Sequence, residues 1–177
     1  LEEFHGAPQK GAVDFAWPYL KHEDRFIKYA ARIAVEHQPV SEWETRALNE
    51  KDPQTLMQAM IALARHGKQN SRNAMLKSLT AISFESLSES QQIDLLRTFE
   101  LVVLRMGIPE AATKAQLVDY LSPHFPAKTH WLNRNLCKVL VYLEAPGSVE
   151  KTLALLETAK DDPAIKTASQ SSDLILR

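Results

Sequence analysis

The sequence predicts an all-α fold, a right-handed α–α superhelix of about five antiparallel helix pairs. Apolar residues recur with the 3.6-residue period of amphipathic helices. The five glycines and nine prolines fall between these periodic segments, as helix stop and start signals do. Alternation of β-branched and polar residues is nearly absent. We therefore expect a single helical-repeat domain over residues 1–177.

Ten helices follow from their end signals. Asp24 is a natural N-cap, and Asp52 precedes a proline, which is the preferred order at a helix start. Ser41 and Glu44 have the spacing of a capping box. The expected helices span residues 13–20, 24–37, 41–49, 52–67, 71–82, 88 or 90 to 106, 109–121, 129–143 and 148–160, and a tenth starts at Asp162 and Pro163.

The segment WPYLKHEDRFIKYAARIAVEH, residues 17–37, is typical of a HEAT-type helical repeat. A short helix ends in Pro-Tyr-Leu, and an acidic turn at Asp24 follows. The next helix opens on Arg25 and Lys28 and places alanines at its packing positions. Corresponding second helices recur at irregular spacing along the chain, so we expect a degenerate HEAT-like solenoid.

The apolar pattern also predicts which faces are buried. Within residues 24–37, apolar side chains recur at i, i+3, i+4 and i+7, so we expect them between neighbouring helices. A polar row occupies the opposite side of this helix: Lys28, Arg32 and Glu36. The apolar run of residues 101–104 predicts a helix packed on both sides. The three tryptophans are expected in the core: Trp17, Trp43 and Trp131.

Composition excludes several functions. The chain has 21 basic and 22 acidic residues and a net charge of −1. Proteins that bind nucleic-acid backbones usually have a basic excess, so we expect no nucleic acid as a partner. No apolar run approaches the ~20 residues that cross a bilayer, so we expect no direct membrane insertion. The chain opens on LEEFHG without Met, and we expect a fragment of a longer multidomain protein.

The residues that carry chemistry have structural explanations. The six histidines show no spacing that places two on one helical face, so no metal site is predicted. Asp24, Asp52 and Asp162 lie at helix starts, where N-capping accounts for them. Cys137 is the only cysteine, which excludes a CxxCH haem attachment, and its apolar neighbours predict a small buried side chain. We therefore predict no enzyme activity, no cofactor and no metal in this domain.

Basic residues of the second helices form the candidate partner-binding surface. Repeat proteins bind along their extended concave side, which such helices line. Lys28 and Arg32 could equally form ordinary salt bridges, including a ladder between adjacent repeats, and this alternative stays open. The candidate surface comprises Arg25, Lys28, Arg32, Arg97, Arg134 and Lys138.

Four segments carry a more specific resemblance: AWPYLKHEDRFIKYAARIAVEHQP, ALARHG, LLRTFELVVLRMGIP and LNRNLCKVLVYLEAPGSVEKTLALL. Together they resemble the helical-repeat segment of large exported bacterial proteins of the planctomycete-type cytochrome, or membrane-bound dehydrogenase, group. The resemblance implies export to the periplasm or cell envelope, a preceding propeller and a following c-type haem domain. Haem binding and dehydrogenase activity are not assigned to these residues, because they contain neither the CxxCH haem-attachment motif nor the propeller.

Three functions stay open. The first is a non-catalytic scaffold or docking domain within a larger exported haem-containing redox protein, whose partners are neighbouring domains or another protein. The second is a general protein- or peptide-binding HEAT module. The third is a HEAT-like DNA glycosylase, which uses a basic concave groove and a catalytic carboxylate, and which the balanced charge disfavours.

Overall fold

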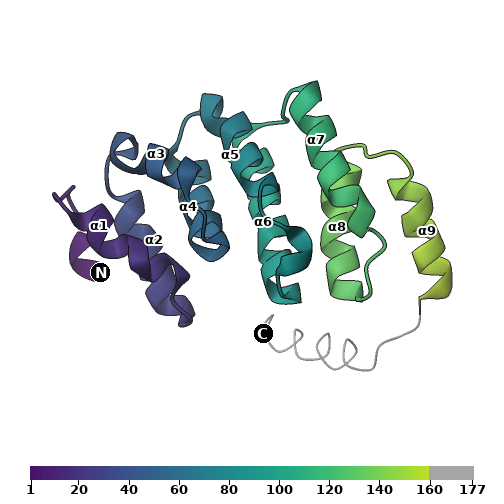
Figure 1. The fold of residues 1–177 in the computed structure, drawn as a ribbon, viewed down its shortest axis with the longest axis horizontal. Helices are drawn as coiled ribbons and strands as arrows, with labels where there is room; N and C mark the ends of the chain where they lie inside the picture. Colours follow the sequence, from purple (N-terminus) through teal and green to yellow (C-terminus); the bar gives the residue numbers. More distant parts are fainter. Residues whose placement is uncertain (160–177) are drawn as a thin grey trace, which may run out of the picture.

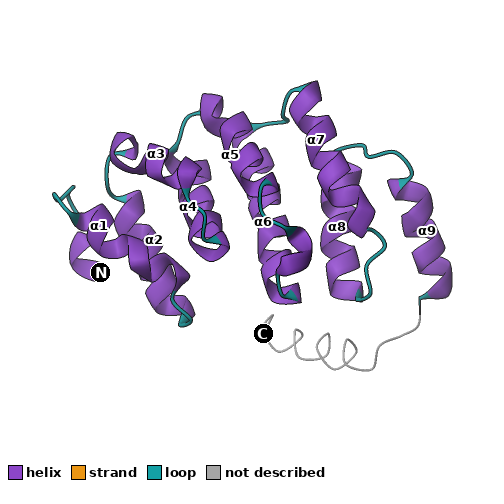
Figure 2. Cartoon of the chain, viewed as in Figure 1, coloured by secondary structure: helices purple, strands orange, loops and turns teal. Residues whose placement is uncertain are grey.

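The computed structural model describes residues 1–159, and every regular element within them is a helix (Figures 1 and 2). The all-α prediction is therefore confirmed for this part of the chain. The α-helices are α1 Ala12–Ala16, α2 Arg25–Glu36, α3 Val40–Asn49, α4 Pro53–His66, α5 Arg72–Thr80, α6 Glu89–Met106, α7 Ala111–Leu121, α8 His130–Tyr142 and α9 Ser148–Thr158. The tenth helix predicted from Asp162 lies outside the described residues.

Side-chain caps start four of these helices, two of them at the predicted caps Asp24 and Asp52. Asp24 Oδ1 accepts a hydrogen bond from the Phe26 backbone N–H at 2.7 Å. Asp52 and Thr129 cap α4 and α8 in the same way. Ser88 starts α6 in a full capping box. Because each cap satisfies an N–H group that has no partner within its helix, these residues fix where the helices begin.

The first predicted helix, residues 13–20, is wrong as a single α-helix. It divides into α1 and a 3₁₀ helix, η2 Trp17–Lys21. Pro18 lies at the start of η2 and has no N–H to continue the α-helical ladder, so the chain tightens there.

The capping box predicted at Ser41 is also wrong. Helix α3 begins one residue earlier, at Val40, and Pro39 occupies its N-cap position without a side-chain cap. Glu44 accepts a hydrogen bond from the hydroxyl of Ser71 instead. Similarly, α7 begins at Ala111 and not at Pro109.

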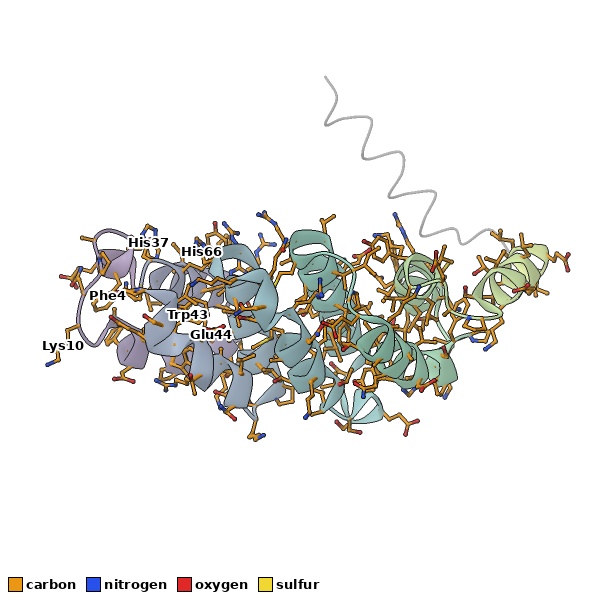
Figure 3. The ribbon with its side chains drawn as sticks, turned by 90° about the horizontal axis from the view of Figure 1, so that it is seen from above. Phe4, Lys10, His37, Trp43, Glu44 and His66 are labelled. Atoms are coloured by element: carbon orange, nitrogen blue, oxygen red, sulfur yellow. The ribbon has the colours of Figure 1, made fainter. Side chains whose placement is uncertain are left out.

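The helices lie in two rows along the long axis of the molecule (Figure 1). Helices α2, α4, α6 and α8 pack against each other in sequence order, and we refer to these four as the lower row. Helices α3, α5 and α7 pack above them. Seen from above, the molecule is elongated, with His37 and His66 along the same edge (Figure 3). These two histidines follow and end α2 and α4, so both helices reach that edge with their C-termini.

One continuous core lies between the two rows. Trp43 and Phe99 are its largest fully buried side chains. Ala59 and Ala62 are fully buried in α4, which packs against α2, α3 and α6. Small side chains at these positions let the helix axes approach closely. The chain leaves α4 at Gly67, where a Cβ atom would lie 2.6 Å from the carbonyl oxygen of Leu63, so only glycine fits there.

Several predicted burials are wrong. In α2, Ala31, Ala34 and Val35 are buried, but Phe26 is 68% exposed. The buried face is turned toward α1, η2 and α4, and the contact with α4 also takes Glu36 out of solvent. Leu104, within the run expected to be packed on both sides, is 76% exposed, and Trp131 is 47% exposed. The row formed by α3, α5 and α7 covers α6 and α8 on one side only. A stretch that is apolar all round must therefore leave some side chains exposed to solvent.

Candidate functional site

The lower row concentrates positive charge. Its four helices carry eight arginine and lysine residues and four carboxylates, although the whole chain has a net charge of −1. All four carboxylates already have partners, in the row or directly before α8. Glu36 is buried, Glu89 accepts from Thr129, and the remaining two form ion pairs: Asp94 with Arg97 and Glu100 with Lys138. The surface left for a partner is therefore mainly cationic.

A hollow of about 430 Å³ lies between α2 and α4. Arg25, Lys28 and Arg32 line it together with two rings and an amide: Phe26, Tyr29 and Gln58. The guanidinium of Arg25 lies 4.7 Å from the centre of the Phe26 ring, and that of Arg32 lies 5.1 Å from the centre of the Tyr29 ring. Such cation–π contacts hold each guanidinium over a ring face and leave its N–H edge for other partners.

A buried carboxylate joins α2 and α4 beside this hollow. One oxygen of Glu36 lies 3.3 Å from Arg65 Nε and from His66 Nε2, and the other lies 3.3 Å from Arg32 Nε. The side chains of Glu36 and Arg32 are only 3% and 13% exposed. Burial lowers the pKa of the Arg32 guanidinium from its ordinary value, and the charge of Glu36 opposes that shift.

This cluster corrects the expectation of a polar row facing away from the packed side of α2. Lys28 is half-buried, and Arg32 and Glu36 point into the contact with α4. Arg32 also donates a hydrogen bond to Gln58 at 3.2 Å. Among the six predicted surface residues, Arg32 therefore has a structural role between two helices of the lower row.

A second hollow, of about 370 Å³, lies between α6 and α8. Leu104 and Tyr142 border it, and they are 76% and 51% exposed. Arg97 and Lys138 lie at its rim, and Lys138 bridges it by an ion pair of 3.2 Å to Glu100. The rest of the lining is apolar: Phe99, Leu101, Val103, Val139 and Leu143.

A third hollow lies between α8 and α9 and is about 530 Å³ in volume. Arg134 and Lys138 line its α8 side, and Leu155 and Leu156 line its α9 side. Cys137 is half-buried there, with its Sγ 3.3 Å from the hydroxyl of Thr152. The thiol thus lies in a helix contact, although less deeply than the sequence predicts.

The structure distributes the six predicted surface residues over three hollows. Arg25, Lys28 and Arg32 line the first, Arg97 and Lys138 the second, and Arg134 shares the third with Lys138. Sequence reasoning missed the exposed apolar residues beside them, above all Leu104 and Tyr142. The sequence shows more apolar residues in these helices than one buried face can hold, so some of them must be exposed. The pattern does not show which ones are exposed.

Within residues 1–159, no three His, Cys, Asp or Glu side chains form a group that could hold a metal ion. In the same part of the chain, no helix is both long enough and apolar enough to cross a membrane. Asp24 and Asp52 act as helix caps, as predicted.

No protein-family model, curated protein or solved structure shows a significant similarity to this chain. The described residues define an all-helical protein whose predicted surface residues line hollows between α2 and α4, between α6 and α8, and between α8 and α9.

Proposed function

We propose that this chain is a non-catalytic docking module whose lower row binds a segment of another domain or protein. In this proposal the helices form a HEAT-like right-handed superhelix. Two pairs of contacts support it. Arg32 meets Gln58 and Glu36 meets Arg65, so α2 and α4 run in the same direction. Glu100 meets Lys138, and Leu104 shares a hollow with Tyr142, so α6 and α8 do too. Equivalent helices of stacked repeats are related in this way.

The α6–α8 hollow is the single observation that carries the proposal. Leu104 and Tyr142 expose apolar surface at the border of a hollow whose lining is mostly apolar. Exposed apolar surface with a polar rim is typical of protein-binding sites. Arg97 and Lys138 supply that rim. An amphipathic helix laid into such a groove buries its apolar face there and meets charge at the edges.

The resemblance to exported redox proteins suggests the setting. We propose that the partner is a neighbouring domain of a larger haem-containing protein, in which this chain is a scaffold without chemistry of its own. A general peptide-binding module is the alternative, and the two share the same docking surface. They differ in whether the partner is covalently part of the same protein.

Selection of peptides from a random display library against the 177-residue chain tests this proposal. We expect enriched peptides that combine apolar and acidic residues. The double variant Leu104→Ser/Tyr142→Ser should weaken their binding about tenfold or more, since burying a leucine or tyrosine contributes ~1–3 kcal/mol.

Phe15→Ser is the matched control, because Phe15 is also half-exposed but lies in α1, outside the lower row. It should leave peptide binding unchanged. Selected peptides that bind the α6–α8 variant as tightly as the unmodified chain would contradict the proposal.

A further inference from the structure

Two cations of the α2–α4 hollow have no carboxylate partner in the described structure. Arg25 is exposed and Lys28 half-buried, and neither forms an ion pair with any residue of 1–159. The neighbouring cations Arg32 and Arg65 share a single carboxylate, Glu36. Like charges gathered this closely repel one another, so a negatively charged partner is favoured at this place.

Nearby acidic residues do not pair with these two cations. Asp24 uses its carboxylate to cap α2. Glu2 and Glu3 line a different hollow, which also includes Phe26. Within residues 1–159, no ion pair therefore neutralises Arg25 or Lys28.

The aromatic rings indicate which kind of anion fits. A single-stranded nucleic acid would need free ring faces on which bases stack. Arg25 already covers one face of the Phe26 ring, and Arg32 covers one face of the Tyr29 ring, which leaves fewer faces for stacked bases. A carboxylate needs only the guanidinium edge. That edge has no hydrogen bond or ion pair at Arg25 within residues 1–159, whereas Arg32 uses its own for Glu36 and Gln58. In addition, Asp94 and Glu100 interrupt the positive charge farther along the row, whereas a phosphate backbone favours a continuous cationic path.

We propose that the α2–α4 hollow binds an acidic peptide segment, with carboxylates paired to Arg25 and Lys28 and an apolar side chain against Phe26 and Tyr29. This inference rests on the proposed function, because it names the chemistry of the partner that the lower row accepts. Its site is separate from the α6–α8 hollow, so the two can fail independently.

Fluorescence anisotropy with a labelled probe tests the inference. The probe is an eight-residue peptide of glutamates with one central leucine and one central phenylalanine. Its control has glutamine in place of every glutamate, and an oligothymidylate of eight nucleotides represents nucleic acid. We expect the acidic peptide alone to bind measurably, with an affinity that falls as salt is added, because exposed charge pairs are screened.

The double variant Arg25→Gln/Lys28→Gln should weaken binding of the acidic peptide about three- to tenfold, which corresponds to two exposed or half-exposed charge pairs. Lys10→Gln/Lys77→Gln removes the same charge at two exposed lysines outside the lower row and should have no effect. Arg25→Gln alone, at an exposed position, keeps the test valid if the double variant folds poorly.

The inference would be overturned if the acidic peptide did not bind, if the Lys10/Lys77 control lost as much affinity, or if the oligothymidylate bound more tightly. A loss caused by Leu104→Ser, but not by Arg25→Gln/Lys28→Gln, would also overturn it while leaving the proposed function intact. Conversely, failure of the display selection, with binding still dependent on Arg25, would contradict the α6–α8 proposal alone.

Discussion

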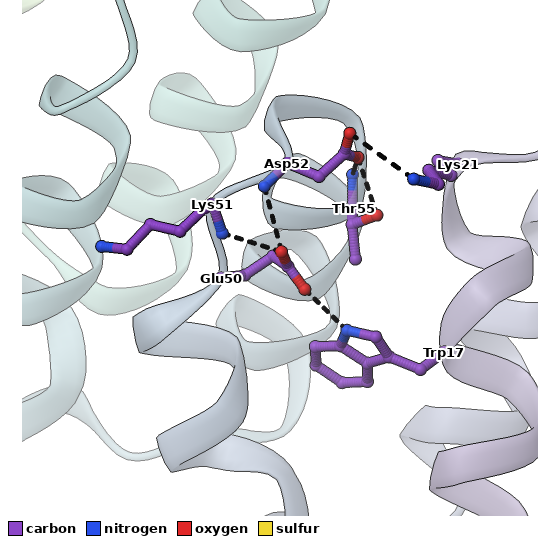
Figure 4. A network of polar contacts seen from close by, with 6 residues as sticks. All are labelled: Trp17, Lys21, Glu50, Lys51, Asp52 and Thr55. Atoms are coloured by element: carbon purple, nitrogen blue, oxygen red, sulfur yellow. Dashed lines mark hydrogen bonds and ion pairs between the residues drawn. The ribbon is translucent and has the colours of Figure 1, made fainter.

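The indole Nε1 of Trp17 donates a hydrogen bond of 2.8 Å to a carboxylate oxygen of Glu50 (Figure 4). The other oxygen of Glu50 accepts from the backbone N–H groups of Lys51 and Asp52, at 2.7 and 3.0 Å. Asp52 in turn caps α4 by accepting from Thr55. One carboxylate therefore ties the 3₁₀ helix η2 to the turn between α3 and α4, next to the residue that caps α4.

Replacing Glu50 tests this connection. Glu50→Ala should lower the free energy of unfolding by about 1–3 kcal/mol, because a largely buried indole N–H loses its acceptor. Glu85→Ala, at an exposed position in the 3₁₀ helix η4 Phe84–Ser86, should change it by less than ~0.5 kcal/mol. Urea denaturation measures both. Equal, small losses would mean that the Trp17 contact contributes nothing to stability.

The same carboxylate predicts a response to acid. Burial alone would raise the pKa of Glu50, but hydrogen bonds from Trp17, Asp52 and Lys51 outweigh it and lower the pKa below 4.5, its ordinary value. Because the lowered pKa favours the ionised carboxylate in the folded state, Glu50 stabilises the protein when the pH is above its ordinary pKa. This contribution is lost as the pH falls through the pKa of the folded state. Stability measured from pH 6 to 3 should therefore fall less steeply in Glu50→Ala than in the unmodified chain.

The buried Glu36 should matter far more than a surface pair. Glu36→Ala leaves the nearly buried guanidinium of Arg32 without its counter-charge, and such losses cost about 3–5 kcal/mol. Asp14→Ala breaks the ion pair between Asp14 and Arg46 on the surface. Because the Asp14 side chain is 85% exposed, this change should cost less than ~1 kcal/mol.

A double variant separates charge from packing at the Glu36 cluster. Arg32→Leu/Glu36→Leu should recover part of the loss seen in Glu36→Ala, because no unpaired charge remains buried. Chemical denaturation of the single and double variants gives the comparison. A double variant that is as unstable as Glu36→Ala would show that packing volume, and not charge, holds α2 against α4.

Core substitutions should distinguish the two faces of α6. Phe99→Ala, at a fully buried position, should lower the free energy of unfolding by about 3–5 kcal/mol, and Leu136→Ala in α8 by about 2–5 kcal/mol. Leu104→Ala, in the same helix as Phe99 but mostly exposed, should cost less than ~0.5 kcal/mol. A large loss for Leu104→Ala would mean that its side chain is packed in solution.

Tyr120 predicts a response to alkali. Burial raises the pKa of its phenol to about 12, and the hydroxyl donates a hydrogen bond of 2.8 Å to the carbonyl of Ile82. Because the raised pKa favours the neutral phenol in the folded state, its stabilisation is complete below pH 10 and is lost as pH rises toward 12. Between pH 9 and 11, the unmodified chain should lose more stability than Tyr120→Phe. Absorbance of phenolate should also show one late ionisation that the variant lacks.

The sequence predicted the helices better than their faces. Asp24, Asp52 and Thr129 act locally on neighbouring backbone N–H groups, so a short stretch of sequence contains the whole interaction. The capping box predicted at Ser41 is wrong because Pro39 holds the N-cap position and α3 begins one residue earlier. Glu44 instead accepts a hydrogen bond from Ser71, which is far away in the chain. Local spacing cannot show such a distant competitor.

The candidate site could be predicted only in part. All six basic residues line hollows of the lower row or its edge with α9. Arg32 differs from the rest because its carboxylate partner is shared with Arg65, a residue of another helix. Leu104 could not be recognised as exposed, because the rotation of α6 against α4 and α8 depends on the packing of all three helices.

Chemical-shift mapping of the isotope-labelled chain shows which helices contact a bound peptide. A display-selected peptide is added stepwise, and the backbone amide signals of every helix are followed. If the lower row is the docking surface, the largest changes fall on α6 and α8 around Leu104 and Tyr142, while α3, α5 and α7 change little. Changes concentrated on α3, α5 and α7, with α6 and α8 unaffected, would contradict it.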